Sequence, residues 1–357
     1  MRVKSISVLL SFLAIAWTSA GTQRLGVSDI RAAIANAGPN SRVNIPAGVY
    51  DIGNTPIRIE GKRGLQISGA GEGRTVIRAG ASAPFIFEMA GTNTNLTVAN
   101  MSLEGATRLA TNTHGLAVGS DRVSLTGARF HNLDSRNVAV GISVANSSSG
   151  ICNDIQITNN SLDNIQDVVQ SGGITSGSGY GIHNDGCTEV RIADNVLRNV
   201  DRHSIYQARA YQPNGSGPGT IVIDHNLIID HAKTSSLHDA WLVAIVVARS
   251  SNVTVSRNVI VNPYHDAMSI EDAPEEGQPL TIRNISLIDN TVLGSRGADI
   301  FLTAGGSYVV SGNRFYHSDA TGSPSTPFVR RAGNGKTGRL VESSPSSAGV
   351  SIPRRIP

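Results

Sequence analysis

Apolar residues recur along the second half of the chain in a fixed arrangement around a repeated asparagine. Apolar residues, most of them β-branched, stand five and three positions before each asparagine, and another stands two positions after it. A spacing of two residues between apolar positions predicts strands. The asparagine marks a bend where its amide can bond to the equivalent residues of neighbouring repeats. The six asparagines, at spacings of 35, 31, 32, 32 and 23 residues, are Asn160, Asn195, Asn226, Asn258, Asn290 and Asn313.

Two earlier repeats fit the same arrangement with Met101 and Ala128 in the place of the asparagine. One repeat cannot bury its own apolar face, so the repeats must stack, at about 4.8 Å per coil. The pattern predicts an all-β, single-domain, right-handed parallel β-helix with three short strands per coil, over residues 21–320. Residues 27–53 predict an amphipathic helix, which caps the open end of the stack, and the first strand and turn. Residues 321–357 lack the periodicity and predict an irregular, surface-lying tail.

The composition agrees with a turn-rich β chain. Glycine makes up 38 of the 357 residues and charged residues only 16%, which disfavours a charged helical bundle or a coiled coil. Residues 1–20 predict a secretory signal peptide, with a basic start, a short apolar run and a small-residue cleavage site. Losing its two basic residues takes the formal charge from +3 to about +1 (3 minus 2), so charge indicates neither a nucleic-acid nor a membrane partner. We expect a secreted monomer, extracellular or periplasmic.

The two cysteines occupy equivalent places in adjacent repeats. Cys152 and Cys187 each stand eight residues before their asparagine. Their Cα atoms should therefore stack about one strand spacing apart, within the range that a disulfide accepts. In an exported protein we expect them to be bonded.

The third strand of each coil carries the candidate site, because the longest insertions flank it. With an apolar residue facing inward in each coil, alternation sends His183, Tyr206 and Ser269 outward at one level, and Asp185 and Glu271 outward two residues on. His183 and Tyr206 should be neighbours on adjacent coils. The inward residues are Ile182, Ile205, Ile245, Met268 and Ile300.

The segment DRHSIYQAR gathers cations, an imidazole and a phenol on one strand. This set suits β-elimination on a uronic acid: a cation neutralises the carboxylate, a base removes the C5 proton, and an acid protonates the leaving oxygen O4. Strict alternation turns His203 inward unless the bend before the strand reverses it. We predict catalytic roles for Tyr206, His203, His183 and Arg202. We predict substrate binding by Arg209, Asp185, Arg249, His265 and Glu271.

Two resemblances to known families accompany these patterns. Residues 43–316 resemble the pectate-lyase-like β-helix superfamily, and NIPAGVYDIG is similar to the opening coil of many members. GYGIHNDGCTEVRIADNVLRNVDRHSIYQAR resembles the catalytic stretch of mannuronan C5-epimerases: it matches that family's Tyr-Gly at Tyr180 and Gly181, its later histidine at His203 and its arginine at Arg209. The family's Asp-Pro-His is replaced by His183-Asn184-Asp185. DRHSIY also resembles segments of β-helix polysaccharide lyases.

We conclude from the sequence that the chain is a secreted polysaccharide lyase acting on an anionic, uronate-containing polysaccharide. Three alternatives stay open: a C5-epimerase, a hydrolase using two of Asp185, Asp266 and Glu271, and a non-catalytic glycan-binding β-helix. Pectate lyases of this superfamily use calcium, and Asp185, Asp266, Glu271 and Asp272 could supply oxygen ligands. Because the arginines can neutralise the substrate carboxylate, we expect no metal or other cofactor, with calcium as the alternative. His225 and His231 are expected to be structural and remote from the groove.

Overall fold

The computed structural model describes most of the chain between residues 26 and 343. The described ranges are 26–106, 116–120, 124–145, 151–167, 169–170, 173–174, 178–209, 219–232, 242–271, 282–302, 306–316, 329–331 and 339–343. The predicted signal peptide, residues 1–20, lies outside them. Within these ranges no helix is long and apolar enough to cross a membrane.

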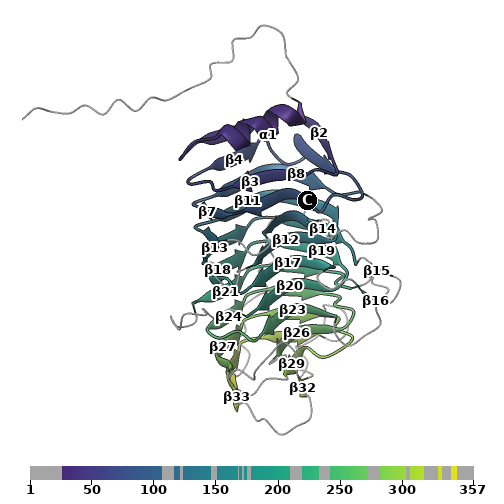
Figure 1. Ribbon diagram of the computed structural model, residues 1–357. Helices are drawn as coiled ribbons and strands as arrows, with labels where there is room; N and C mark the ends of the chain where they lie inside the picture. The colour runs from purple at the N-terminus through teal and green to yellow at the C-terminus, as the bar shows by residue number, and fades with distance from the viewer. Residues whose placement is uncertain are drawn as a thin grey trace, which may run out of the picture.

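Three strands make one coil, and successive coils stack through parallel pairing (Figure 1). One coil consists of β17 (Tyr180–Asp185), β18 (Thr188–Ala193) and β19 (Val196–Val200). The next strand, β20 (His203–Ala208), returns to lie beside β17. The described strands thus take their ladder hydrogen bonds from neighbouring coils, on both sides except at the ends of the stack, so no coil is complete alone.

The strands form three rows along the stack. One row is a separate ten-stranded sheet, which we call the site sheet: β3 (Ile57–Glu60), β6 (Phe85–Ala90), β9 (Leu116–Ser120), β12 (Val140–Ala145), β17, β20, β23 (Val243–Ala248), β26 (Asp266–Glu271), β29 (Ile300–Leu302) and β32 (Val329–Arg331). The other two rows join at a bend into one 21-stranded sheet within the described ranges.

The first row of that larger sheet is β1 (Arg42–Ile45), β4 (Gln66–Gly69), β7 (Thr92–Thr94), β10 (Ser124–Thr126), β13 (Cys152–Thr158), β18, β21 (Ile221–Asp224), β24 (Val253–Ser256), β27 (Ile282–Ile288), β30 (Gly306–Ser311) and β33 (Arg339–Ser343). The second row is β2 (Gly48–Gly53), β5 (Thr75–Ala79), β8 (Thr97–Glu104), β11 (Arg129–Val138), β14 (Ser161–Ile165), β19, β22 (Leu227–Ile229), β25 (Val259–Val261), β28 (Thr291–Leu293) and β31 (Arg314–Tyr316). A short antiparallel pair, β15 (Val169–Gln170) and β16 (Gly173–Ile174), lies between β14 and β17.

The predicted cap helix is present at the N-terminal end of the stack. Helix α1 (Val27–Asn36) lies across the first coil (Figure 1) and buries Ile30 and Ile34 against it. These residues lie four apart on one helix face, as an amphipathic helix requires. The helix therefore covers the apolar end of the core, which stacking cannot cover.

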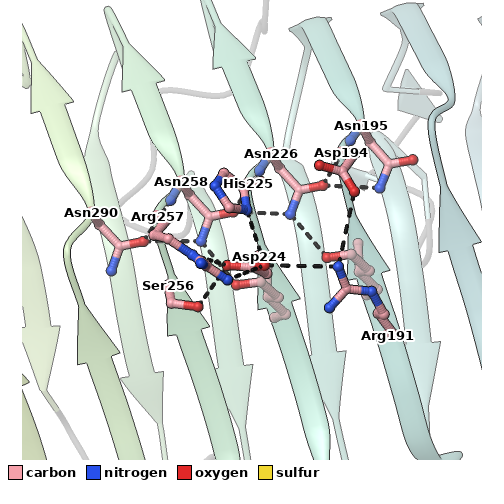
Figure 2. Close-up of polar contacts among 12 residues, drawn as sticks. Arg191, Asp194, Asn195, Asp224, His225, Asn226, Ser256, Arg257, Asn258 and Asn290 are labelled. Atoms are coloured by element: carbon pink, nitrogen blue, oxygen red, sulfur yellow. Dashed lines mark hydrogen bonds and ion pairs between the residues drawn. The ribbon is translucent and has the colours of Figure 1, made fainter. Parts of the chain in front are cut away.

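The asparagine ladder is confirmed at each of the six predicted positions. The side-chain amides of the first five donate to the side-chain oxygen of the next asparagine at 2.9 Å. That oxygen also accepts the backbone N–H of the preceding asparagine at 2.9–3.1 Å. Figure 2 shows the part of the ladder from Asn195 to Asn290. The amide further donates to a backbone carbonyl of the previous coil, as Asn258 does to Ile223 at 3.0 Å. The ladder thus satisfies both the buried side chains and the backbone at the bend.

The register predicted for the repeat before Asn160 was wrong by five residues. Met101 stands where predicted, but its partner in the next coil is Leu133 rather than Ala128. The backbone N–H of Leu133 donates to the side-chain oxygen of Asn160 at 3.0 Å, which confirms its place. The error arose because the residue two positions on is Ser135, which is buried although it is polar. The apolar pattern around Ala128 therefore fitted the repeat better than the true register did.

A charged cluster lies beside the ladder on β21 and β24 (Figure 2). Asp224 is buried and accepts hydrogen bonds from Arg257 at 2.7 and 2.9 Å, from Ser256 at 2.8 Å and from His225 at 3.1 Å. Burial alone would raise the pKa of Asp224, but these hydrogen bonds outweigh it and hold the pKa below its usual value. His225 is thus a structural partner, as the sequence predicts.

The predicted disulfide is confirmed. Cys152 and Cys187 are bonded, and their Cα atoms lie 4.6 Å apart, about one strand spacing. The two residues belong to adjacent coils, because β13 pairs with β18. The bond closes a loop of 35 residues and ties these two coils together covalently.

Two stretches of the predicted tail are strands. β33 pairs in parallel with β30, and β32 pairs in parallel with β29. Parallel stacking thus extends beyond residue 320, and the expectation of an irregular segment does not hold for these two stretches. They escaped the sequence pattern because no asparagine or period-2 apolar run marks them. The rest of the predicted tail lies outside the described residues.

We predict that Asn258→Ala lowers the free energy of unfolding by about 1 to 3 kcal/mol, because it removes the oxygen that accepts from two buried N–H groups of Asn226 and the amide that donates to the backbone oxygen of Ile223. Asn44→Ala makes the same chemical change at an exposed strand position and should alter stability by less than about 0.5 kcal/mol. Urea unfolding followed by circular dichroism measures both. Equal effects of the two substitutions would contradict a stabilising ladder.

Candidate active site

The site sheet aligns the predicted third-strand residues. Ile182 pairs with Ile205, which pairs with Ile245, and these side chains are buried in the core. One residue on, His183 pairs with Tyr206 across adjacent coils, as predicted. Both side chains are half-buried on the outer face of the sheet. Their strands, β17 and β20, lie near the middle of the stack (Figure 1).

A column of small residues precedes the inward isoleucines. Gly181 stands before Ile182 and Ser204 before Ile205. A Cβ atom on Gly181 would lie 2.6 Å from a methyl carbon of Leu197, which is in the core, and 2.5 Å from the backbone oxygen of Ser204. This position therefore also faces inward, and the alternation is broken. As a result, Tyr180, which precedes Gly181, and His203, which precedes Ser204, are turned to the outer face.

Four rings meet on that outer face, and we call them the ring cluster: Tyr180, His183, His203 and Tyr206. The ring centroids of neighbouring members lie 5.1–5.5 Å apart, mostly in stacked arrangements. Each of the two strands β17 and β20 contributes one tyrosine and one histidine. Two phenols and two imidazoles, all able to carry protons, thus share one patch of the sheet.

One cation lies over the ring cluster and another is paired beside it. The guanidinium carbon of Arg202 lies 5.3 Å from the ring centroid of Tyr180. Arg209 donates to the carboxylate of Asp185 on the adjacent coil, with Nε at 2.6 Å. The predicted pair of binding residues Arg209 and Asp185 therefore forms an ion pair at the end of the two strands, whereas Arg202 lies at their start.

Both histidines of the ring cluster are held neutral. Burial among the rings lowers the pKa of His183 to about 4; Asp185 opposes this shift, and Arg209 and Arg202 add to it. Burial also lowers the pKa of His203 well below its usual value, and Arg202 lowers it further. The Nδ1 of His203 lies 3.0 Å from the backbone oxygen of Val243, which can only accept. Nδ1 therefore carries the proton, and Nε2 is left as a proton acceptor.

His231 lies behind the ring cluster and is fully buried. Its Nδ1 lies 3.1 Å from the hydroxyl oxygen of Ser204, the neighbour of His203 in β20. Burial lowers the pKa of His231 to about 3. The sequence-based expectation that this residue is remote from the site was therefore wrong: it contacts the strand that carries two of the four rings.

Three predicted substrate-binding residues lie on later coils, away from the ring cluster. Arg249 follows β23 and is buried, and Glu271, at the end of β26, is buried and accepts a hydrogen bond from Ser269 at 2.6 Å. His265 is half-buried before β26 and contacts the ring of Tyr264. Their predicted roles stay predictions, as do those of the ring cluster.

The carboxylates proposed as alternative calcium ligands do not form a cation site among the described residues. Asp185 is paired with Arg209, Glu271 with Ser269, and Asp266 accepts the backbone N–H of Ala298 at 2.6 Å. No three His, Cys, Asp or Glu side chains converge in the described ranges. Asp272 lies outside those ranges, as do most residues of the long insertions expected to border this face.

Sequence reasoning did not assign a role to Tyr180, which contacts each of the other three rings. The signal was present in the aligned strands. Five inward residues of the third strand are each preceded by a small one, namely Gly141, Gly181, Ser204, Ala244 or Ala267, whereas Ile300 follows Asp299. A column of small residues at this place indicates that two consecutive residues of the strand face the core. The residue before the small one then points to the outer face.

No model of a known protein family and no curated protein matches the chain. Among solved structures, the A-module of the Azotobacter vinelandii mannuronan C-5 epimerase AlgE4 is similar at a TM-score of 0.54 and 15% identity, covering 82% of this chain and 75% of that one. The chain has the right-handed parallel β-helix fold. The handedness and the fold predicted from the sequence are thereby confirmed.

Two further solved structures are similar at lower scores. A PL6 alginate lyase in complex with a trisaccharide has a TM-score of 0.49 and 14% identity, covering 82% of this chain and 57% of that one. The catalytic unit of a GH87 α-1,3-glucanase from Streptomyces thermodiastaticus has a TM-score of 0.45 and 14% identity, covering 89% of this chain and 64% of that one. This chain thus spans less than two thirds of both proteins.

We predict that acid destabilises the protein between about pH 6.5 and pH 4. In that window the unfolded chain protonates His183, His203 and His231, and the folded chain does not, so the free energy of unfolding falls as pH falls. His231→Gln removes one of these groups and should make the pH dependence shallower by up to about 1.4 kcal/mol per pH unit. Urea unfolding at a series of pH values measures the slope.

The control for this prediction is Tyr206→Phe, which changes the same region without removing an imidazole. Its stability should keep the pH dependence of the parent. A His231→Gln protein with an unchanged slope would contradict the burial of a neutral imidazole at this position.

Proposed function

We propose that the protein cleaves a uronate-containing polysaccharide by β-elimination. The observation that carries this proposal is the ring cluster with Arg202 over one of its rings, because it brings proton carriers and a cation to one place. Elimination needs these three functions: neutralisation of the sugar carboxylate, removal of the C5 proton and protonation of O4.

The charge and protonation state of each residue determine which of the three functions it performs. The guanidinium of Arg202 pairs with the substrate carboxylate and makes the C5 proton more acidic. Nε2 of neutral His203 accepts that proton. The electron pair of the C5–H bond forms the C4–C5 double bond, the C4–O4 bond breaks, and the phenol of Tyr206 gives its proton to O4. Proton exchange with water then restores His203 and Tyr206.

The position of the ring cluster favours elimination over epimerisation at C5. The four rings lie on the outer face of one sheet, so a sugar resting on them presents one side to all of the proton carriers. Removal of the C5 proton and protonation of O4 can both occur from that side. Inversion at C5 needs a second proton donor on the opposite side of the sugar ring, and the ring cluster does not supply one.

Epimerisation is the second candidate, and one observation favours it. A solved structure that is similar at a TM-score of 0.54 is named as a mannuronan C-5 epimerase module. Both reactions begin with removal of the same proton from a uronate, so the two candidates share Arg202 and His203. They differ in where the second proton goes.

Hydrolysis by two carboxylates receives less support. Such a reaction needs two carboxyl groups flanking the glycosidic bond, one of them free to protonate it. Asp185 is held by Arg209, and Asp266 and Glu271 are buried and hydrogen-bonded within the scaffold.

Secretion is part of the proposal. The Cys152–Cys187 bond is typical of proteins that leave the reducing cytoplasm, and the first twenty residues have the pattern of a signal peptide. A polysaccharide too large to enter a cell would be met in that compartment.

We predict that the purified protein releases unsaturated oligosaccharides from at least one of alginate, glucuronan, pectate and glycosaminoglycans. The proposed reaction draws its cation from Arg202, so it should proceed in buffer containing EDTA. Ultraviolet absorbance detects the new double bond, and a reducing-end assay counts all breaks. Breaks without absorbance would assign a hydrolase. Deuterium incorporation at C5 in heavy water without breaks, read by NMR, would assign an epimerase.

We predict that Tyr206→Phe lowers turnover at least ~100-fold, since a positioned acid contributes about 10² to 10⁴. Tyr206 is half-buried on the outer face, so the loss of one hydroxyl should change stability by less than about 0.5 kcal/mol. Tyr316→Phe removes the same hydroxyl from β31, on another face, and serves as the control. Full activity of Tyr206→Phe on a substrate that the parent cleaves would exclude this phenol as the acid.

A further inference from the structure

A second arginine lies over a tyrosine ring at the edge of the site sheet. The guanidinium carbon of Arg296 lies 5.0 Å from the ring centroid of Tyr264. Arg296 precedes β29, and Tyr264 precedes β26, the strand that pairs with β29. Arg202 and Tyr180 have the same relation, with the arginine before β20 and the tyrosine on the coil before it. Of the residues that the structure describes, these are the two arginines that lie over tyrosine rings.

Backbone hydrogen bonds place both arginines at equivalent positions of the stack. The N–H of Tyr264 donates to the oxygen of His231 at 3.0 Å, and the N–H of Arg296 donates to the oxygen of Pro263 at 3.4 Å. Each of these residues lies between a strand of the second row and a strand of the site sheet, as Arg202 does. The strands β20, β23, β26 and β29 are successive in the site sheet (Figure 1). Arg202 and Arg296 therefore lie three coils apart, about 14 Å at one strand spacing per coil.

The guanidinium of Arg296 has no carboxylate partner among the described residues. Its side chain is exposed, whereas the neighbouring carboxylates of Asp266 and Asp299 are buried. By contrast, Arg257 in the charged cluster beside the ladder is held by Asp224. The donors of Arg296 are thus held in place by an aromatic ring and are accessible to a ligand.

The chemistry of this group of side chains suits an acidic sugar. A guanidinium stacked on a ring directs its N–H groups outward in one plane, where two of them can bind both oxygens of a carboxylate. The ring restricts the side chain before a ligand arrives, so less conformational entropy is lost on binding. The half-buried His265, whose ring centroid lies 5.4 Å from that of Tyr264, adds an imidazole. An imidazole can donate to or accept from a sugar hydroxyl, so carboxylate and hydroxyls both find partners here.

We propose that Arg296, Tyr264 and His265 form a second uronate-binding subsite, which holds the polysaccharide away from the reacting bond. This inference rests on the proposed function, because it takes the anionic polymer of that proposal as its ligand. A polyuronate carries one carboxylate on every sugar, so different sugars of one polymer can supply the carboxylates for Arg202 and for Arg296. The subsite raises the affinity for the polymer and takes no part in proton transfer.

Calorimetry with hexasaccharides of mannuronate, guluronate and galacturonate tests the subsite in the full-length protein. Arg296→Gln should weaken binding of the hexasaccharide that the parent binds most tightly at least ~5-fold, because it removes charge-assisted hydrogen bonds to a carboxylate. Arg283→Gln removes the same charge from an exposed position on β27, outside the site sheet, and should change the affinity less than ~2-fold. Equal weakening by both variants would overturn the inference, since it would report net charge alone. Unchanged binding by a folded Arg296→Gln protein would also overturn it.

A matched pair of variants tests whether the tyrosine ring positions the arginine. Tyr264→Phe keeps the ring beneath Arg296 and should change hexasaccharide affinity less than ~2-fold. Tyr264→Leu removes the ring and should weaken binding at least ~3-fold in the parent, but less than ~2-fold in an Arg296→Gln protein, because the two residues act together. Thermal unfolding checks that each variant folds. A Tyr264→Leu effect of equal size in both proteins would overturn the proposed arrangement.

Kinetics separate this inference from the proposed function. On the polymer that the parent cleaves, Arg296→Gln should raise KM and leave kcat within ~2-fold, because the subsite binds ground state and transition state alike. A lower kcat at unchanged KM would overturn the inference and leave the proposed lyase standing. If the parent cleaves no polymer but Arg296→Gln still weakens hexasaccharide binding, the proposed function fails and the subsite stands. Absence of binding by every hexasaccharide would overturn both.

Discussion

The hydrogen bonding between coils determines everything else in this structure. No coil contains a partner for its own strands, so each depends on the next for its backbone hydrogen bonds. The asparagine ladder extends this dependence to the bend, where a backbone turning between two strands would leave donors unpaired. A buried amide with partners on both sides fixes the register of the whole coil. Because register is fixed, outward residues on neighbouring coils are held one strand spacing apart.

The ring cluster is a consequence of that register combined with a local departure from it. His183 and Tyr206 meet because their coils are aligned. Tyr180 and His203 join them because the small residues Gly181 and Ser204 fill an additional inward position and reverse the face before it. A larger side chain at Gly181 would collide with the backbone of the next coil. The scaffold thus places the four rings through the small size of residues outside the ring cluster.

The sequence predicted those features that depend on repetition. The asparagine positions, the inward Ile182 and Ile205 and the cysteine pair all recur at equivalent places, so each repeat supports the others. Features that interrupt the repeat were missed. The ladder position of Leu133 was missed because the residue two positions after it is the buried, polar Ser135. Tyr180 received no role because strict alternation of inward and outward residues does not allow two consecutive residues to face the core. The partners of Asp266 and Glu271 could not be predicted, because they depend on side-chain contacts rather than on spacing.

The position of the Cys152–Cys187 bond along the stack determines how far unfolding can spread from the N-terminal end. A solenoid in which each coil contacts only its neighbours can unravel stepwise from either end. Helix α1 protects one end, and the disulfide joins the coil that contains β17 to the coil before it. Fraying that advances from the N-terminal end would therefore meet a covalent stop immediately before the strands that carry the rings. The bond therefore keeps local loosening of the N-terminal coils from reaching the ring cluster.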